Sequence, residues 1–252
     1  MIDELSIDIN CDLGEGIAIE DCEKDALLMP YISSCNIACG GHAGNPLTIR
    51  ESLNNARAHQ LKVGAHPGYP DKDNFGRQSM DLSYRKLETV LLSQMYHFID
   101  IAEAEDVAIH HIKFHGALYN DIEKNQQLAV DVTNIVMRFF PSLKVVGLGD
   151  GKLQQSCNRL GLSFIAEGFI DRSYLSNGRL TPRSENGALL SDHNRSIDQA
   201  IALACNEKFE TNDGHHINRK VDTLCFHGDN PDALQLIKQL NTAFTQSGIT
   251  IQ

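Results

Sequence analysis

The chain lacks any apolar run long enough to cross a membrane and any block rich in lysine and arginine. Its 33 acidic and 22 basic residues give a net charge of -11. Because an acidic surface without a basic patch repels a phosphate backbone, we expect neither nucleic acid nor an anionic membrane as a partner. The first ten residues, MIDELSIDIN, have no basic segment followed by an apolar one, so we expect a cytoplasmic protein.

Several catalytic and nucleotide-binding signatures are also missing. GxSxG and HExxH do not occur, which removes support for a serine hydrolase or a zincin. The glycine-rich stretch GLGDGK at 147–152 is not a P-loop, because Lys152 is followed by Leu153 rather than by a serine or threonine. Any nucleotide would therefore have to be bound without a recognisable phosphate-binding loop.

The cysteines show no metal-binding spacing. The chain has seven of them, an odd number, and no CxxC pair. Cys11, Cys35 and Cys39 could in principle offer thiolates to zinc, but apolar strands bury cysteine as a small hydrophobic residue. We predict reduced, structural thiols.

Seven short apolar runs alternate with helical stretches along the whole chain. Strands are predicted at Ser6–Asn10, Cys35–Cys39, Leu61–Ala65, Ile109–Phe114, Leu143–Leu148, Ser163–Ala166 and Thr223–Phe226. Helices are predicted at Pro46–His59, with Asn45 as N-cap, and at Ser83–Glu105, Glu123–Phe139, Gly151–Leu160, Ser196–Lys208 and Pro231–Gln246. Such alternation predicts a parallel sheet wrapped by helices, and a length of 252 residues suits a single α/β domain over residues 1–252.

Polar residues recur where these strands end, as they do in β/α-barrel enzymes. Asp8, Asn10 and Asp12 alternate along the first strand, so we expect their side chains to share one side and reach the barrel mouth, before a Gly-rich LGEG turn. Histidines follow later strands, each near a glycine or proline that lets the backbone turn sharply: His42, His66, His115 and His227. A single such histidine is usually a packing residue, but four at successive strand ends favour a shared site.

Two long irregular segments, Pro67–Asp81 and Phe169–Asp192, are expected to cover that site, because loops of this length in a compact domain are typically functional or disordered. Lys113 lies on the fourth strand on the same face as His115, and the second segment supplies Arg172 and Arg183. These cations could hold a carboxylate or phosphate, although the arginines could equally be solvated loop charges.

At these residues the sequence resembles the LamB/YcsF family. The matching stretches are IDINCDLGEG at 7–16, CNIACGGHAGNP at 35–46, VGAHPGYPD and FGR within 63–77, KFHGALYN at 113–120, EGFIDRSY at 167–174 and CFHGDNP at 225–231. The resemblance implies an irregular seven-stranded β/α barrel, like that of polysaccharide deacetylases. It also implies ATP-dependent opening of the lactam ring of 5-oxo-L-proline to L-glutamate, with ADP and phosphate as further products and with two separately encoded partners, subunits B and C.

On this basis we predict a site and leave two alternatives open. Catalytic roles are predicted for Asp12, His42, His66, Lys113, His115 and His227. Substrate binding is predicted for Asn10, Asn36, Arg77, Glu167, Asp171, Arg172, Arg183 and Asp229, and a divalent cation such as Mg²⁺ at Asp8 and Asp12. The alternatives are a metal-dependent amide hydrolase or deacetylase acting without ATP, with Asp12, His42 and His66 as ligands, and a non-enzymatic carrier or regulator.

Overall fold

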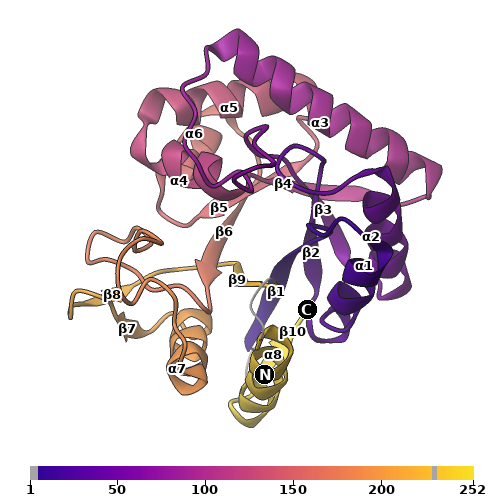
Figure 1. The fold of residues 1–252 in the computed structure, drawn as a ribbon. Coiled ribbons are helices and arrows are strands. Elements are labelled where there is room, and N and C mark those ends of the chain that lie inside the picture. The colour runs from indigo at the N-terminus through magenta and orange to yellow at the C-terminus, as the bar shows by residue number, and fades with distance from the viewer. Residues whose placement is uncertain (1–4, 229–231) are drawn as a thin grey trace.

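Seven parallel strands close into a barrel at the centre of the molecule (Figure 1). The computed structural model describes residues 5–228 and 232–252. The barrel strands are β1 (Leu5–Leu13), β2 (Ser34–Ala38), β3 (Lys62–His66), β4 (Ile109–Lys113), β5 (Lys144–Leu148), β6 (Phe164–Phe169) and β9 (Thr223–His227). They are hydrogen-bonded in that order, and β9 pairs with β1 to complete the ring. All seven predicted strands are confirmed, as is the seven-stranded β/α barrel.

Strand β1 is longer at both ends than predicted, and this determines where its polar residues lie. Successive residues of a strand point to opposite sides and advance about 3.3 Å each. Asp8, Asn10 and Asp12 pair in register with Thr223, Cys225 and His227 of β9, so they follow one another along the barrel axis. Asp8 therefore lies about 13 Å from Asp12 along the strand, at the amino end of the barrel.

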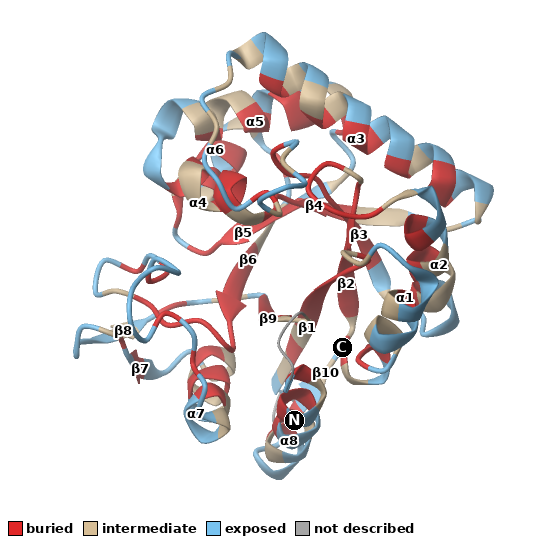
Figure 2. Ribbon diagram, in the orientation of Figure 1, coloured by how far each residue is buried: buried red, intermediate tan, exposed pale blue. Residues whose placement is uncertain are grey.

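Helices surround the barrel and bury their apolar faces against it (Figure 2). They are α1 (Ile19–Ala26), α2 (Pro46–Ala58), α3 (Tyr84–Ala104), α4 (Gly116–Lys124), α5 (Gln126–Phe139), α6 (Lys152–Leu160), α7 (His193–Ala204) and α8 (Ala233–Gln246), with a 3₁₀ turn η1 at Met29–Tyr31. Asn45 caps α2 as predicted, since its Oδ1 accepts bonds from the backbone N–H groups of Leu47 and Thr48.

Two predicted helices differ from the observed ones, and the start of a third is not described. The predicted helix Glu123–Phe139 is two helices, because Asn125 leaves the helical conformation and its side chain caps α5. Helix α7 begins earlier than predicted, at His193, where Asp192 caps its first turn. The start predicted at Pro231 for the last helix lies outside the described residues.

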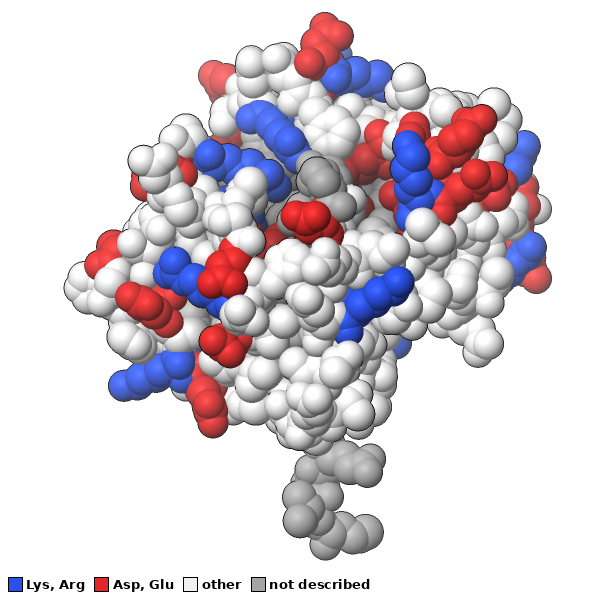
Figure 3. Space-filling view, turned by 60° about the horizontal axis from the view of Figure 1, so that its bottom comes forward, with Lys and Arg blue, Asp and Glu red and all other residues white. Residues whose placement is uncertain are grey.

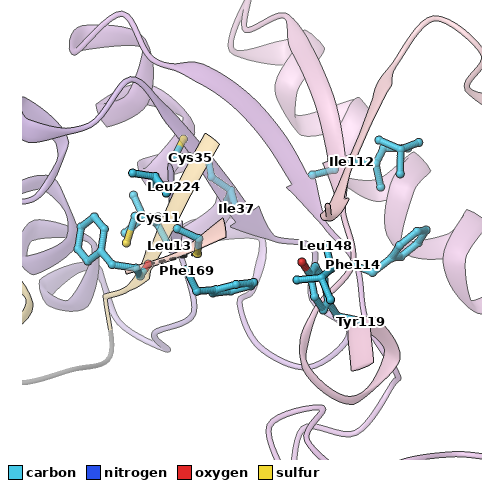
Figure 4. Close-up of a cluster of buried hydrophobic side chains, with 14 of the residues drawn as sticks. Cys11, Leu13, Cys35, Ile37, Ile112, Phe114, Tyr119, Leu148, Phe169 and Leu224 are labelled. Carbon is cyan, nitrogen blue, oxygen red and sulfur yellow. Dashed lines mark hydrogen bonds between the residues drawn. The ribbon is translucent and has the colours of Figure 1, made fainter. Parts of the chain in front are cut away.

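Most of the apolar core lies between the strands and the helices. Figure 4 shows two parts of it, one around Leu13, Ile37 and Leu224 on β1, β2 and β9, and one around Phe114 and Leu148. All seven cysteines are free, as predicted, and all but Cys205 are buried. Inside the barrel, polar residues such as Asn10 and His111 lie beside apolar Val146 and Ile165.

Smaller elements extend this frame. Strand β10 (Ile249–Ile251) pairs in parallel with the first residues of β1, and β7 (Lys208–Glu210) with β8 (His216–Asn218) forms an antiparallel hairpin beside the 169–192 segment. Acidic and basic side chains are intermixed on the face shown in Figure 3. Within residues 5–228 and 232–252, no helix has the length and apolarity that crossing a membrane requires.

The packing of α2 against the barrel predicts unequal effects of two leucine truncations on the same helix. Leu53 is 0 % exposed and Leu47 is 62 % exposed. We expect Leu53→Ala to lower the free energy of unfolding by about 2–5 kcal/mol, because it opens a cavity in the core. Leu47→Ala, the matched control, should change it by no more than about 0.5 kcal/mol. Urea denaturation measures both, and equal losses would contradict this packing.

Candidate active site

The carboxyl ends of the barrel strands open into a cavity of about 390 Å³. Residues from the whole length of the chain line it, as expected where parallel strands end together. Among the residues predicted for the site, those lining the cavity are Asp12, Arg77, Lys113, His115, Arg172, Arg183 and His227. Asp229 lies outside the described residues.

A buried lysine lies at the base of this cavity between two carboxylates. Lys113 is 2 % exposed, and its Nζ lies 2.8 Å from Asp12 Oδ1 and 2.8 Å from Glu167 Oε1. It also donates to Asn10 Oδ1 and Cys225 Sγ, at 3.2 and 3.0 Å. Burial alone would lower the pKa of Lys113, but its anionic neighbours, Asp12 first, raise that pKa well above its usual value. With its hydrogens already engaged, Lys113 has no donor left for the anion-binding role considered from the sequence.

Four predicted site residues serve other protein groups instead of facing the cavity. Asn10, Asn36 and Glu167 are buried inside the barrel, where they bond to one another, to Asp12 or to Lys113. Asp8 lies at the amino end, where it accepts bonds from Ser33, Ser34 and Thr223. The cation predicted at Asp8 or Asp12 cannot contact both, because β1 places the two carboxylates at opposite ends of the barrel.

Three histidines and a glutamate converge beside Asp12. One ligand atom each from Glu15, His42, His66 and His115 lies within 4.8 Å of the others. Glu15 Oε1 is 3.0 Å from His42 Nε2 and 3.1 Å from His115 Nδ1. His66 Nε2 lies 3.3 Å from Asp12 Oδ2. Three of the four histidines predicted at strand ends thus lie in one cluster, and His227 lies apart from it.

Backbone carbonyls decide which nitrogen of two rings carries the proton. His66 Nδ1 lies 2.8 Å from the carbonyl oxygen of Lys113, and His115 Nε2 lies 2.9 Å from that of Phe75. A carbonyl only accepts, so these nitrogens must be protonated. The inward nitrogens, His66 Nε2 and His115 Nδ1, are then bare in the neutral rings, although they lie 3.0 Å apart. Two lone pairs that face each other next to carboxylates require a shared proton or a cation.

Burial and charge give the histidines different proton affinities. Burial lowers the pKa of His42 to about 4 and also lowers that of His115. Burial acts the same way on His66, but the carboxylate of Asp12 outweighs it and raises the pKa of His66. The rings of His42 and His115 stack at 3.5 Å, which suits two neutral imidazoles. His66 is therefore the histidine of this cluster best suited to take up a proton.

Glu15 was missed by the sequence analysis, which treated LGEG only as a turn. Gly14, with a φ of +70°, turns the chain immediately after β1, and its N–H donates to the Asp25 carboxylate at 2.8 Å. This turn brings Glu15 back over the histidines. Burial would raise the pKa of Glu15, but its bonds to His115 and His42 lower it well below its usual value. The sequence signal that points to Glu15 is an acidic residue between two glycines, directly after a strand that carries site residues.

This donor set fits a divalent cation of the zinc type. Three imidazoles and one carboxylate suit Zn²⁺ or a similar transition metal, whereas Mg²⁺ prefers oxygen ligands. Each of His66 and His115 has its outer nitrogen fixed by a carbonyl, as metal-binding histidines usually do. Buried His42 Nδ1 has no hydrogen-bond partner.

A second acid–histidine pair and two arginines also lie at the cavity. Asp171 is buried and holds His227, whose Nδ1 lies 3.0 Å from each carboxylate oxygen. Arg172 donates to the backbone carbonyls of Ala188 and Thr181, so its guanidinium is fixed within the 169–192 segment. Burial and the neighbouring Arg183 lower the pKa of Arg172 to about 10. The cavity is thus lined by both acidic and basic groups.

Together, the barrel and its mouth define a parallel β/α-barrel protein with a candidate cation site next to a buried acid–lysine–acid cluster. The chain belongs to the LamB/YcsF family, whose sequence profile matches residues 7–252. This confirms the predicted family.

Relatives match along nearly the whole chain. One from Chloroflexus aggregans, named as the A subunit of 5-oxoprolinase, is 38% identical over 248 residues and covers 98% of each chain. Another of the same name from Tolumonas auensis is 36% identical over 246 residues, again covering 98% of each. The crystal structure of the lactam utilization protein from Thermus thermophilus is 34% identical, with a TM-score of 0.90 over 98% of this chain and 99% of the other.

The histidine cluster predicts specific metal binding. We expect chelator-treated protein to bind one equivalent of Zn²⁺ in calorimetric titration. His66→Ala or His115→Ala should weaken that binding at least about tenfold, because each removes an inward-facing ligand nitrogen. His97→Ala, on the exposed side of α3, is the control and should bind as the wild type does. Equal affinity in all four proteins would show that the cluster is not a metal site.

The low pKa of His42 predicts a pH dependence of stability in the metal-free protein. The pKa is about 4 in the folded state, against about 6.5 in the unfolded chain. The unfolded state therefore binds more protons between these values, and stability is lost as pH falls from about 6.5 to 4.

Replacing this histidine should remove its share of that dependence. His42→Gln retains an N–H donor for Glu15 and should reduce the slope by up to about 1.4 kcal/mol per pH unit. Urea denaturation across the range measures this. A slope in His42→Gln as steep as in the control His97→Gln would mean that His42 does not titrate in this way.

Proposed function

We propose that this chain is the A subunit of an ATP-dependent 5-oxoprolinase. It would act in the cytoplasm with subunits B and C to convert 5-oxo-L-proline, ATP and water to L-glutamate, ADP and phosphate. Full-length relatives named as the A subunit of 5-oxoprolinase support the proposal. The observation that carries it is the cavity itself, which is lined by Asp12, with His66 in contact behind it, and by the cationic side chains of Arg77, Arg172 and Arg183.

The difficulty of the reaction lies in the lactam bond. Amide resonance makes the carbonyl carbon of 5-oxoproline a poor electrophile. Transfer of the γ-phosphoryl group of ATP to the lactam oxygen would give an imidate-like phosphate ester. Water could then attack the ring carbon, the carbon–nitrogen bond would break as the nitrogen takes a proton, and a second water would hydrolyse the resulting acyl phosphate to L-glutamate and phosphate. The site must therefore hold an anion, deprotonate water and protonate the nitrogen.

Anion binding falls to the arginines rather than to Lys113. Arg172 and Arg183 lie together on the 169–192 segment, and Arg77 lines the cavity from the other segment. A guanidinium can hold a carboxylate or phosphate through two parallel bonds. The substrate carboxylate or the phosphate of the activated lactam would bind here.

Water activation is assigned to Asp12 with His66. The pKa of His66 is raised, and a base is most effective when its pKa lies near the working pH. A proton taken from water would lie between His66 Nε2 and Asp12 Oδ2, which are 3.3 Å apart, so the carboxylate stabilises the charged ring. The low pKa of His42 makes it a poor base in the same cluster.

Proton donation to the leaving nitrogen is assigned to His227. Asp171 accepts from Nδ1 and so orients the ring, which leaves Nε2 to exchange a proton at the cavity. If Glu15, His42, His66 and His115 held a divalent cation, His66 Nε2 would be one of its ligands, so Asp12 alone would accept the proton from water, and the cation would supply Lewis-acid polarisation beside Asp12.

Two substitutions test the assignment of the base. Asp12→Asn and His66→Ala should each lower the kcat of the complex reconstituted with subunits B and C by roughly 10²- to 10⁴-fold, the usual contribution of a general base. Glutamate release is the measurement, and His97→Ala should match the wild type. Full activity of either variant would remove Asp12 or His66 from the mechanism.

The same assay separates the proposal from its alternatives. Glutamate and phosphate release would be measured with this chain alone, with all three subunits, and with subunits B and C alone. Turnover only in the full set and only with ATP supports the proposal. Turnover by this chain alone without ATP would favour a metal-dependent amide hydrolase, and binding of 5-oxoproline without turnover in any mixture would favour a carrier.

A further inference from the structure

The carboxylate of Asp12 is oriented by a buried amide inside the barrel. Asn36 is 0 % exposed, and its Nδ2 lies 2.9 Å from Asp12 Oδ1 and 2.7 Å from Asn10 Oδ1. A carboxylate accepts hydrogen bonds only, so the nitrogen of this amide must face Asp12. The oxygen of Asn36 must then point the other way, toward β4.

That oxygen meets a histidine outside the catalytic cluster. His111 Nε2 lies 2.7 Å from Asn36 Oδ1, so this nitrogen must carry a proton and donate it. His111 is buried, and burial lowers its pKa to about 3, so the ring is neutral and Nδ1 is bare. Half-buried His110 fits this arrangement, since its Nδ1 lies 3.1 Å from His111 Nδ1 and can donate to it.

The neighbouring amide is oriented from the amino end of the barrel in the same way. Thr223 donates through Oγ1 to Asp8 Oδ2 at 2.6 Å, and it accepts from Asn10 Nδ2 at 2.8 Å. Asn10 Oδ1 is thereby turned toward Lys113 and Asn36. Each hydrogen bond in this series can run in only one direction, and the series ends at the carboxylate of Asp12.

Space for the His111 ring is provided by a glycine on the adjacent strand. A Cβ built at Gly64 would lie 2.1 Å from His111 Nε2. The register between β3 and β4 shifts at this point, between Val63 and Gly64. Any larger residue at Gly64 would displace the ring that holds Asn36.

We propose that His111 is a positioning residue for Asp12, acting through Asn36, and that Asp8 does the same from the amino end through Thr223 and Asn10. His111 has no place in the cavity at the barrel mouth, and it lines instead a separate cavity of about 190 Å³ with Asp8. The chain of bonds is not a proton wire, because the amide of Asn36 does not pass on a proton. It fixes orientation only, and its catalytic consequence rests on the function proposed above.

A pair of substitutions at His111 tests this role. His111→Phe keeps a ring of similar shape but removes the donor, and His111→Gln places an N–H donor near the position of Nε2. In the complex with subunits B and C, we expect His111→Phe to lower kcat about 10- to 100-fold with KM changed less than about twofold, as when an orienting partner is lost. His111→Gln should recover most of the loss, and His97→Phe should match the wild type.

A second measurement does not depend on activity. In the isolated chain with ¹⁵N-labelled asparagine, the Nδ2 protons of Asn36 should exchange slowly with solvent, because both are bonded within the barrel. His111→Phe should speed that exchange roughly tenfold or more, and His111→Gln should restore slow exchange. This result stands even if the wild-type complex has no 5-oxoprolinase activity, a failure that would concern the proposed function alone.

Two outcomes would overturn the proposal. One is unchanged Asn36 exchange in a folded His111→Phe variant. The other is a loss of activity that parallels a loss of thermal stability in both His111 variants, with no recovery in His111→Gln. That result would show that His111 only supports the fold. Asp8→Asn gives a further check. An amide at position 8 can donate to Thr223 Oγ1 as well as accept from it, so Thr223 would no longer be forced to accept from Asn10.

Discussion

The ion cluster of Asp12, Lys113 and Glu167 is the constraint on which the rest of the barrel depends. A buried ammonium is tolerated only where carboxylates and further acceptors surround it, and loss of one partner leaves an uncompensated charge. Lys113 on β4 can meet Asp12 on β1 and Glu167 on β6 only across a closed barrel. The interior therefore contains a polar cluster, and most of the apolar core lies in the layer between strands and helices.

The same arrangement prepares the mouth for chemistry. Lys113, the last residue of β4, offers its backbone carbonyl to His66, and Phe75 in the 67–81 segment offers its carbonyl to His115. Each carbonyl fixes a tautomer, so the remaining nitrogens point at the same small volume. The 169–192 segment holds the side chain of Arg172 in place through its own backbone carbonyls. The result is a cavity lined by both proton-accepting and cationic groups.

Much of the fold could be predicted because its determinants are local. Each barrel strand is a short apolar run, and the alternation with helices leaves few topologies other than a parallel sheet. Asn45 marks the start of α2 through its own side-chain bonds. Predictions failed where a boundary depended on partners elsewhere in the chain. β1 continues through polar Asp12 because β2 and β9 pair with it there, and the helix predicted over Glu123–Phe139 divides at Asn125.

The residue types at the strand ends can be read from the sequence, and they predict that the histidines, Asp12 and Lys113 gather at one mouth. The role of each side chain depends on the folded arrangement. Asp8 and Asp12 look equivalent in sequence, yet strand length places them at opposite ends of the barrel. Glu15 joins the histidines because a turn folds it back, and the positive charge of Lys113 is balanced in part by Glu167 on β6. The physical reason is that charge, protonation and hydrogen-bond direction depend on neighbours in space, which residue type and spacing do not specify.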